Sequence, residues 1–182
     1  CVIQLMMGLP GADAAADMAT ARGVAALRPE GVRIHPTLVL RGTALDAMVR
    51  RGAWSPPELD EAVERVAGMV SIIEDAGIAV LRLGIQETDG LRARVVAGAW
   101  HPAFGELVRG ELLARRLAGR LGEGERSVRI PRTEASFLLG HGRRGLRRLE
   151  ALVEEVLLDG HQQVVGRHAQ EDMGLHAVLE MM

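Results

Sequence analysis

The stretch Val2-Ile3-Gln4-Leu5-Met6-Met7-Gly8-Leu9-Pro10-Gly11 decides the fold of this chain, because it is an apolar run with the length of a buried strand and it ends in a glycine turn. A similar run follows at residues 31–43, and a helical pattern fills residues 13–27 between them. Strand, helix and strand in this order predict a β-α-β unit with parallel strands, in an open sheet or a barrel. Functional residues in such folds gather at the carboxyl ends of the strands, here near residues 8–11 and 36–43.

The rest of the chain alternates between helices and strands and then changes character. Residues 32–40 are predicted to form one continuous strand. The predicted elements after it are a short helix at 44–51, a long helix at 58–76, strands at 78–85 and 91–97, and a helix at 104–121. Past a predicted linker at 122–125, the pattern gives strands at 128–130 and 162–165 and helices at 134–139 and 146–157. We therefore predict an α/β unit over residues 1–121 and a small α+β unit over residues 126–182.

Composition narrows the class of protein. The chain has 182 residues and a net charge of -2, and all of its basic residues are arginine. No window reaches the roughly 18 uninterrupted apolar residues of a membrane span, so we expect no membrane association and a cytoplasmic location. The single cysteine, Cys1, excludes an internal disulfide framework and a multi-cysteine metal site within this chain. Because so apolar a parallel strand needs neighbours on both sides, we expect residues N-terminal to Cys1 to be missing, and the isolated chain to be poorly soluble.

Several polar residues in or beside the apolar runs are candidates for a site. Gln4 is a lone amide in the first run, and an unpaired buried amide costs about 1–3 kcal/mol, so we expect it to meet a ligand or a neighbouring strand. Gly8 to Gly11 allow either a tight turn or the close approach of a ligand. Arg33 and His35 share one face of the second strand, where a ligand contact and a core salt bridge are both open.

A glycine-rich turn in the last third of the chain is a candidate for RNA binding. It lies between two predicted helices, and four arginines follow it at helical spacing: Arg143, Arg144, Arg147 and Arg148. Exposed backbone N–H groups and arginines suit a nucleic-acid backbone. A solvated charged face balanced by nearby glutamates is the alternative.

The first hundred or so residues, taken together, resemble a known family. The order Gly8-Leu9-Pro10-Gly11, then Ile34-His35-Pro36-Thr37-Leu38-Val39-Leu40-Arg41-Gly42-Thr43, then Arg50-Arg51-Gly52 and Glu61-Ala62-Val63 is similar to radical S-adenosylmethionine (SAM) proteins related to the catalytic subunit of Elongator. The segments 78–86 and 101–108 resemble the bacterial members that lack an acetyltransferase domain. The resemblance covers roughly residues 2–110.

This resemblance implies the C-terminal part of a partial, TIM-like β/α barrel that begins near the fifth strand. The three cysteines that hold the [4Fe–4S] cluster of such proteins lie early in the chain, so they are expected in the missing N-terminal part. The resemblance implies that the intact protein cleaves SAM to a 5′-deoxyadenosyl radical and modifies the wobble uridine of transfer RNA. This chain alone is expected to be inactive, because one cysteine cannot hold the cluster.

The resemblance also implies roles for single residues, although it identifies no catalytic residue and no metal ligand. The expected SAM contacts are Gln4, Gly8, His35, Thr37 and Leu38, and Elongator relatives commonly have Tyr where this chain has His35. The expected substrate contacts at the mouth of the barrel are Arg41, Arg82, Gln86 and His101. Arg143 and Arg144, in the last third of the chain (the tail), are expected to contact the substrate as well.

The role of the tail and the class of substrate each have alternative interpretations. The turn at residues 140–143 is also similar to the glycine loop of K-homology RNA-binding domains. Transfer RNA or another RNA is the expected partner, and DNA is not expected. One alternative is an RNA-binding module whose chemistry resides elsewhere. Another is a small-molecule radical SAM enzyme of the coproporphyrinogen-oxidase type.

Overall fold

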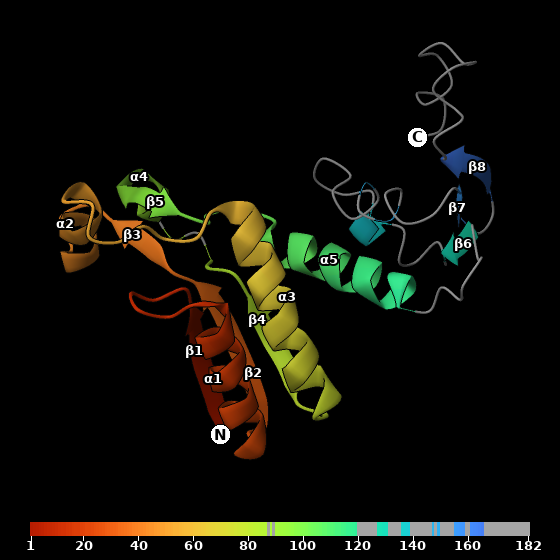
Figure 1. Ribbon diagram of the computed structural model, residues 1–182, viewed down its shortest axis with the longest axis horizontal. Helices are drawn as coiled ribbons and strands as arrows, with labels where there is room; N and C mark the ends of the chain where they lie inside the picture. The colour runs from red at the N-terminus through yellow and green to blue at the C-terminus, as the bar shows by residue number, and fades with distance from the viewer. Residues whose placement is uncertain are drawn as a thin grey trace, which may run out of the picture. The chain divides into compact units, whose positions relative to one another are not determined.

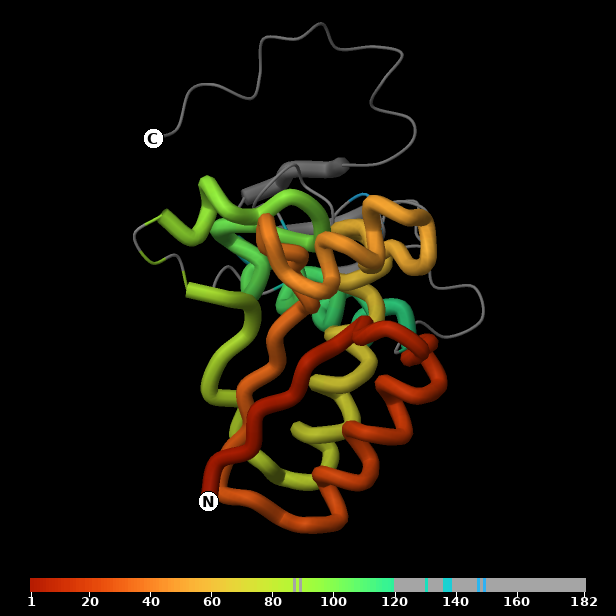
Figure 2. The backbone as a smooth tube through the Cα atoms, turned by 90° about the vertical axis from the view of Figure 1, so that its left-hand side faces the viewer, coloured from red at the N-terminus to blue at the C-terminus, as the bar shows by residue number. Residues whose placement is uncertain are grey.

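A computed structural model describes the backbone of residues 1–86, 88, 90–119, 127–130, 136–138, 147, 149, 155–158 and 161–165. These residues belong to two compact units, Cys1–Leu112 and Leu113–Met182. Each unit is considered by itself below, and Figures 1 and 2 show the elements of the first. The predicted linker at residues 122–125 lies outside the described residues.

The first unit is built on a parallel sheet of three strands. Strands β1 (Val2–Met7), β2 (Gly31–Pro36) and β4 (Ala79–Leu83) lie in the order β1-β2-β4, and both pairings are parallel. Helices α1 (Ala14–Ala26) and α3 (Leu59–Asp75) pack side by side along the same face of this sheet (Figures 1 and 2). The predicted β-α-β unit and third apolar strand are therefore confirmed.

The two long helices follow from local signals in the sequence. The Asp13 carboxylate caps α1 by accepting the backbone N–H of Ala16 at 2.8 Å. The apolar stripe of α3 repeats at helical spacing, and Gly77 follows the helix with a φ of 74°. The residues of α3 that are buried in the core are Ala62, Val63, Val66, Ala67, Met69, Val70 and Ile73.

A second, two-stranded sheet shows that the prediction of one strand over residues 32–40 was wrong. The run divides at Thr37, and strand β3 (Leu38–Leu40) pairs antiparallel with β5 (Val95–Gly98). The neighbouring strand β1 ends at Met7, so the chain has no parallel partner beyond Thr37 and changes sheets. Helix α2 (Ala44–Arg50) follows β3 and is capped by the Thr43 hydroxyl.

The region before β5 also differs from the prediction of a strand over residues 91–97. Residues Leu91–Arg94 form a helical turn, α4, and the strand begins only at Val95. Gly90 precedes the turn with a φ of 78° and starts the change of direction. Helix α5 (Phe104–Ala118) then runs across the boundary between the two units.

The second unit contains a three-stranded mixed sheet. Strands β6 (Ser127–Ile130), β7 (Glu155–Leu158) and β8 (His161–Val165) lie in the order β6-β7-β8, with β6 and β7 parallel and β7 and β8 antiparallel. The predicted helix over residues 146–157 is wrong at its end, because the apolar segment from Glu155 pairs with strands on both sides. No helix within the described residues is long and apolar enough to cross a membrane.

Candidate functional site

The two faces of the parallel sheet have different surroundings. One face is closed by α1 and α3, and its side chains Leu5, Met7, Val32 and Ile34 belong to the core. Side chains of the other face, which we call the open face, are exposed or half-buried: Val2, Gln4, Met6, Arg33, His35, Leu81 and Arg82. The register places Gln4 beside Arg33, and Arg33 beside Arg82, so three polar side chains form a row across the three strands.

Gln4 was predicted to be buried, and this was wrong. Its neighbours Leu5 and Met7 point into the core, whereas Gln4 is exposed on the open face. The alternation of a strand puts successive side chains on opposite faces, so an apolar run with one covered face still exposes every second residue. Its contact with SAM stays a prediction, and its place on the open face is compatible with one.

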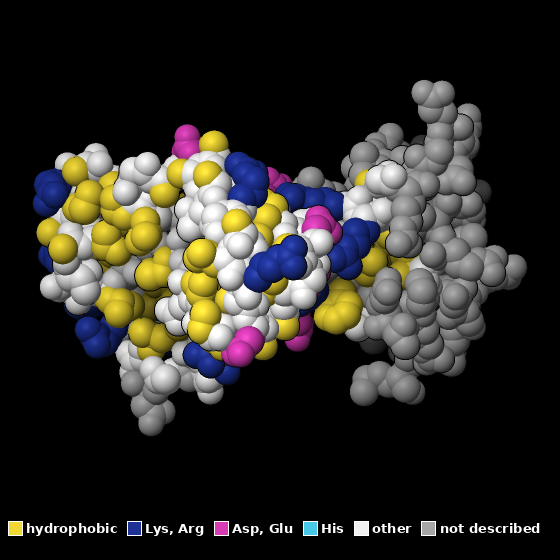
Figure 3. All heavy atoms as spheres, turned by 90° about the horizontal axis from the view of Figure 1, so that it is seen from below, with side chains coloured by type: hydrophobic (Ala, Val, Ile, Leu, Met, Phe, Trp, Pro, Cys, Tyr) yellow, Lys and Arg dark blue, Asp and Glu magenta, His cyan; other side chains and the backbone are white. Residues whose placement is uncertain are grey.

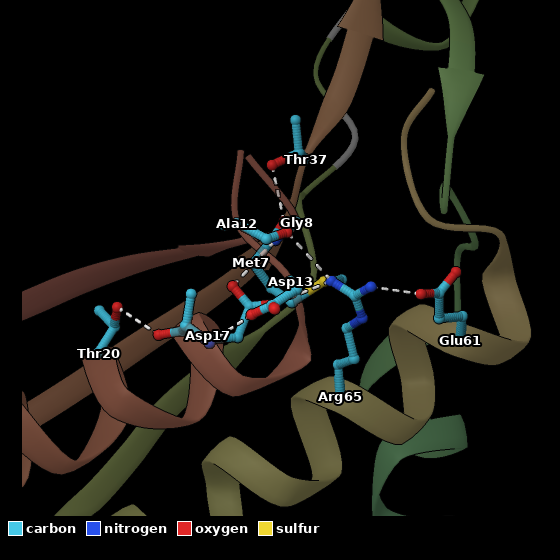
Figure 4. A network of polar contacts seen from close by, with 10 residues as sticks. Met7, Gly8, Ala12, Asp13, Asp17, Thr20, Thr37, Glu61 and Arg65 are labelled. Carbon is cyan, nitrogen blue, oxygen red and sulfur yellow. Dashed lines mark hydrogen bonds and ion pairs between the residues drawn. The ribbon is translucent and has the colours of Figure 1, made fainter. Parts of the chain in front are cut away.

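The turn after β1 is held by a network of polar contacts (Figure 4). The Gly8 N–H donates to Oδ1 of Asp17 at 3.2 Å, and Nη1 of Arg65 donates to Oδ2 of Asp17 at 3.2 Å. The same Nη1 reaches the carbonyl of Ala12 at 3.5 Å, and Nη2 pairs with Glu61. The network therefore ties the turn to α1 through Asp17 and to α3 through Arg65.

The sequence reasoning missed Asp17 and Arg65, although α1 contains a usable signal. Asp17 lies one turn before Ala21 and two turns before Val24, on the buried side of the helix. A carboxylate in a buried stripe requires a partner, because an unpaired buried charge is strongly unfavourable. That signal predicts an ion pair, although it does not say which arginine provides it.

Gly8 is also required by packing. Its φ is 77°, and a Cβ built there would lie 2.7 Å from Cγ of Pro57. Gly11, at the other end of the turn, has a φ of 81° but nothing within 4 Å of a built Cβ. Close approach of Pro57 thus explains the glycine at position 8, and its contact with SAM stays a prediction.

Thr37 and Leu38 lie where β2 leaves the parallel sheet. The Thr37 hydroxyl donates to the carbonyl of Met7 at 2.7 Å, and the Thr37 N–H donates to the same oxygen at 3.0 Å. Both residues are buried. The hydroxyl of Thr37 therefore holds the ends of β1 and β2 together, which is a structural task, and the predicted SAM contacts of the two residues stay predictions.

Two histidines among the candidate residues, His35 and His101, have complementary hydrogen bonds. Nδ1 of His35 lies 2.6 Å from the carbonyl of Gly84, which can only accept, so Nδ1 carries the proton and Nε2 of the neutral ring is an acceptor. His101 has the opposite arrangement, since its Nδ1 accepts the N–H of Ala103 at 3.1 Å. Gly84 follows β4 and Ala103 precedes α5, so these bonds hold each ring at the end of a different element.

Two of the predicted substrate residues are brought together. Nη1 of Arg82 donates to Oε1 of Gln86 at 2.6 Å, and both side chains are exposed. Arg41 lies in a different place, after β3, where its backbone N–H donates to the carbonyl of Arg94 at 2.8 Å. Arg143 and Arg144 lie outside the described residues. The roles of all of these residues in substrate binding stay predictions.

A second aspartate organises the turn after β3. The carboxylate of Asp46 accepts the N–H of Gly42 at 2.7 Å and is paired with Arg50. These contacts hold the pKa of the Asp46 carboxyl below its ordinary value; the hydrogen bond from Arg50 is the largest cause and the one from Gly42 the second. The segment from Arg41 to Thr43 is thereby anchored to α2.

The described part of the chain offers no cluster of metal-ligating side chains. Among the described residues, no group of three or more His, Cys, Asp or Glu side chains could hold a metal ion. Cys1, the one cysteine of the sequence, is exposed. Iron–sulfur clusters are held by several cysteine thiolates, so the residues present do not fit such a cluster.

Comparison with known families and curated proteins gives a consistent set of matches. Residues 29–114 match the family described as the radical SAM C-terminal domain. The tRNA uridine(34) acetyltransferase of Methanocaldococcus jannaschii is 35% identical over 72 residues, which are 38% of this chain and 13% of that protein. Human Elongator complex protein 3 is 42% identical over 48 residues, which are 25% of this chain and 9% of that protein. The chain thus spans a small part of the length of these relatives.

A solved structure resembles the chain as well. It is that of the archaeal Methanocaldococcus infernus Elp3 with an N-terminal deletion, and the TM-score is 0.54 at 28% sequence identity. The similarity covers 64% of this chain and 27% of that one.

Proposed function

Because this chain is related to the radical SAM proteins of the Elongator type, in their C-terminal part, we propose that it forms the later strands of a radical SAM barrel in an enzyme that modifies transfer RNA. The observation that carries the proposal is the open face of the parallel sheet. Polar side chains form a row across its three strands, while the other face is closed by helices. In β/α barrels the sites lie at the carboxyl ends of the strands, which in this chain is the end of the open face beside Gly8 and Thr37.

SAM is the cofactor that the proposal requires, and the open face offers suitable groups. The Gln4 amide can donate and accept hydrogen bonds, Nε2 of His35 can accept one, and Met6, opposite His35 in the register, provides apolar contact. The turn at Gly8 and the end of β2 at Thr37 and Leu38 flank this surface. When bound, SAM supplies radical chemistry through its reductive cleavage, and the residues named here bind and orient it.

The [4Fe–4S] cluster that reduces SAM is proposed to have its ligands outside this chain. Cys1 could provide at most one thiolate. We propose that the cluster cysteines and the earlier strands are encoded upstream of Cys1, that the chain alone is inactive, and that the enzyme works in the cytoplasm. Three closely spaced cysteine codons upstream in the gene are the expected finding, and an upstream sequence without them would refute the enzymatic proposal.

The substrate proposed is transfer RNA, since the related protein from Methanocaldococcus jannaschii is named for uridine 34 of tRNA. The paired Arg82 and Gln86, together with Arg41 and His101, would contact it near the carboxyl ends of the strands, and Arg143 and Arg144 would contact it from the tail. RNA-dependent cleavage of SAM by the purified full-length protein is the expected result. Cleavage that does not respond to RNA, but responds to a small-molecule substrate, would contradict this part of the proposal.

The SAM site is tested by equilibrium dialysis of radiolabelled SAM against the full-length protein. Loss of one hydrogen bond to a ligand costs about 1–1.5 kcal/mol, so Gln4→Ala and His35→Ala should each lower the affinity by about tenfold. Arg22→Ala is the matched control, because Arg22 is an exposed polar residue of α1, away from the open face. Unchanged affinity in both open-face variants would refute the placement of SAM on this surface.

A further inference from the structure

Positive charge is concentrated at one end of the first unit. The segments 38–54 and 90–100 hold β3, α2, α4 and β5, and we call them the arginine lobe. Their five arginines and one acidic residue are Arg41, Arg50, Arg51, Arg92, Arg94 and Asp46. Five positive charges and one negative charge give the lobe a net charge of +4, whereas the whole chain has -2. The lobe therefore differs in charge from the rest of the molecule.

The contacts within the lobe leave most of this charge exposed. Asp46 is buried and is paired with Arg50, so its negative charge neutralises Arg50 and not the other arginines of the lobe. The other four arginines are exposed and form no salt bridge within the described part of the chain. On the face that Figure 3 draws, the end of the first unit that holds α2 shows Lys or Arg side chains and no acidic ones among the described residues. This surface is suited to a polyanion.

The backbone brings the arginines of the two segments together. β3 and β5 pair antiparallel, and the Arg41 N–H donates to the carbonyl of Arg94 at 2.8 Å. The guanidinium carbon of Arg92 lies 4.7 Å from the centroid of the Trp100 ring, which holds the side chain over the indole. Arg41 and Arg94, which are far apart in the sequence, thus lie next to each other at one end of this small sheet.

Aromatic side chains add a second signal. The chain has two tryptophans and no tyrosine, and both tryptophans, Trp54 and Trp100, lie in the arginine lobe. Both are half-buried, so part of each ring is accessible. Arginines beside accessible aromatic rings are typical of surfaces that bind RNA, where guanidinium groups contact phosphates and rings stack on bases. An acidic protein partner would need the arginines but not the rings.

We propose that the arginine lobe binds the phosphate backbone of the RNA substrate next to the open face; this rests on the proposed function. The lobe lies at the carboxyl end of the parallel sheet, beyond the ends of β1 and β2 (Figure 1). RNA held there has its backbone beside the end of the sheet where Gly8, His35 and Gly84 are located. Arg41 and Arg94 contact phosphates, while Arg92 and Trp100 together contact an unpaired base.

The experiment compares matched double variants of the full-length protein. The probe is a transfer-RNA transcript with uridine at position 34, and its affinity is measured by fluorescence anisotropy over a series of salt concentrations. Arg41→Gln/Arg94→Gln removes two charges from the lobe, and Arg22→Gln/Arg28→Gln removes two exposed charges at α1 and just after it. Both pairs change the net charge equally, so only location differs between them.

Each phosphate contact to a single strand contributes about 0.7 to the slope of log affinity against log salt. The lobe variant should therefore bind the transcript about tenfold or more weakly at moderate salt, and the slope of log affinity against log salt should become shallower by about 1.4. The α1 variant should keep an affinity and a slope near those of the wild type. Equal losses in both variants, or no loss in either, would overturn the proposal, as would binding of an acidic protein instead of the transcript. SAM affinity serves as the fold control, since the lobe variant should retain it.

The outcomes also separate this proposal from the proposed function. If the wild type binds the transcript and the lobe variant binds it equally well, the lobe proposal fails and the enzymatic proposal stands. If the wild type binds SAM but no RNA, the choice of transfer RNA as substrate fails first, and the lobe proposal fails with it.

Discussion

Two turns of this protein use the same chemistry over different distances in the chain. After β1, the Gly8 N–H is bound by Asp17, and Asp17 is paired with Arg65. After β3, the Gly42 N–H is bound by Asp46, and Asp46 is paired with Arg50. Arg65 comes from another helix and its side chain is 16% exposed, whereas Arg50 is four residues from Asp46 and its side chain is 68% exposed.

The comparison shows how the same set of groups can do different work. The Asp46 and Arg50 pair lies within one helix and stabilises a local turn, and a pair whose cation is exposed to water contributes little. The Asp17 and Arg65 pair joins α1 and α3 to the turn between β1 and α1, in surroundings that exclude most of the water. A partner removed there leaves a charge that cannot be solvated.

The largest effect is expected from breaking the buried pair. Arg65→Met leaves the Asp17 carboxylate with the Gly8 N–H but without its cation, and removing one partner of a buried pair costs about 3–5 kcal/mol. We expect about 3 kcal/mol here, since Arg65 keeps some exposure, measured as the free energy of unfolding in urea. Asp17→Asn/Arg65→Met should recover part of the loss. If Arg65→Met is as stable as the wild type, the Asp17 and Arg65 pair contributes no more to the free energy of unfolding than the Asp46 and Arg50 pair.

Gly8→Ala should have the next largest effect. A side chain at positive φ costs about 1 kcal/mol, and the contact with Pro57 adds a further steric cost, for a total of about 2 kcal/mol. Gly11→Ala is the matched control, because Gly11 has a similar φ but open space around it. The destabilisation of the two variants, measured by thermal unfolding, should differ only by the cost of the steric contact with Pro57. Equal destabilisation would mean that Pro57 moves aside without cost.

A smaller effect is expected at the second turn. Arg50→Ala removes the exposed partner of Asp46, and water can replace it, so the midpoint of thermal unfolding should fall by much less than in Arg65→Met. Measurement at low and high salt sharpens the contrast, because added salt should screen the pair with the exposed Arg50 and leave the pair with Arg65 largely unchanged. A loss equal to that of Arg65→Met would remove the distinction between the two turns.

The smallest effect is a dependence on pH. Because the pKa of Asp46 is lowered in the folded protein, its carboxylate stabilises the fold above the pKa that it has when unfolded. That contribution is lost as the pH falls through the lowered pKa. The difference in melting temperature between wild type and Asp46→Asn should therefore shrink as the pH is lowered from about 6 to about 3. A constant difference would indicate that the charge of Asp46 does not contribute.

Much of the first unit could be predicted from local patterns. The β-α-β unit, the long helix α3 and the relationship to Elongator-type radical SAM proteins are confirmed. Local patterns failed where a partner strand decides the outcome. The run 32–40 has the composition of one strand, yet it divides at Thr37 because β1 ends beside it. The segment from Glu155 has helical spacing but pairs as a strand between two others.

The candidate site shows the same division. The residues that come from the motifs, such as Gln4, His35 and Arg82, lie on the open face or at its end, in line with strand alternation. The network of Asp17 and Arg65 was missed, because the two residues are 48 positions apart and neither belongs to a motif. Sequence spacing indicates which face a side chain occupies, but not which distant side chain it meets.

The sequence by itself determined the glycine turns, the apolar stripes of the helices and the parallel order of the strands, since these depend on backbone conformation and local periodicity. The tertiary structure alone decided where β2 ends, that Gln4 is exposed, and which arginine neutralises Asp17. Those outcomes depend on hydrogen bonds and ion pairs between segments distant in the chain, whose free energy is gained only when the segments meet.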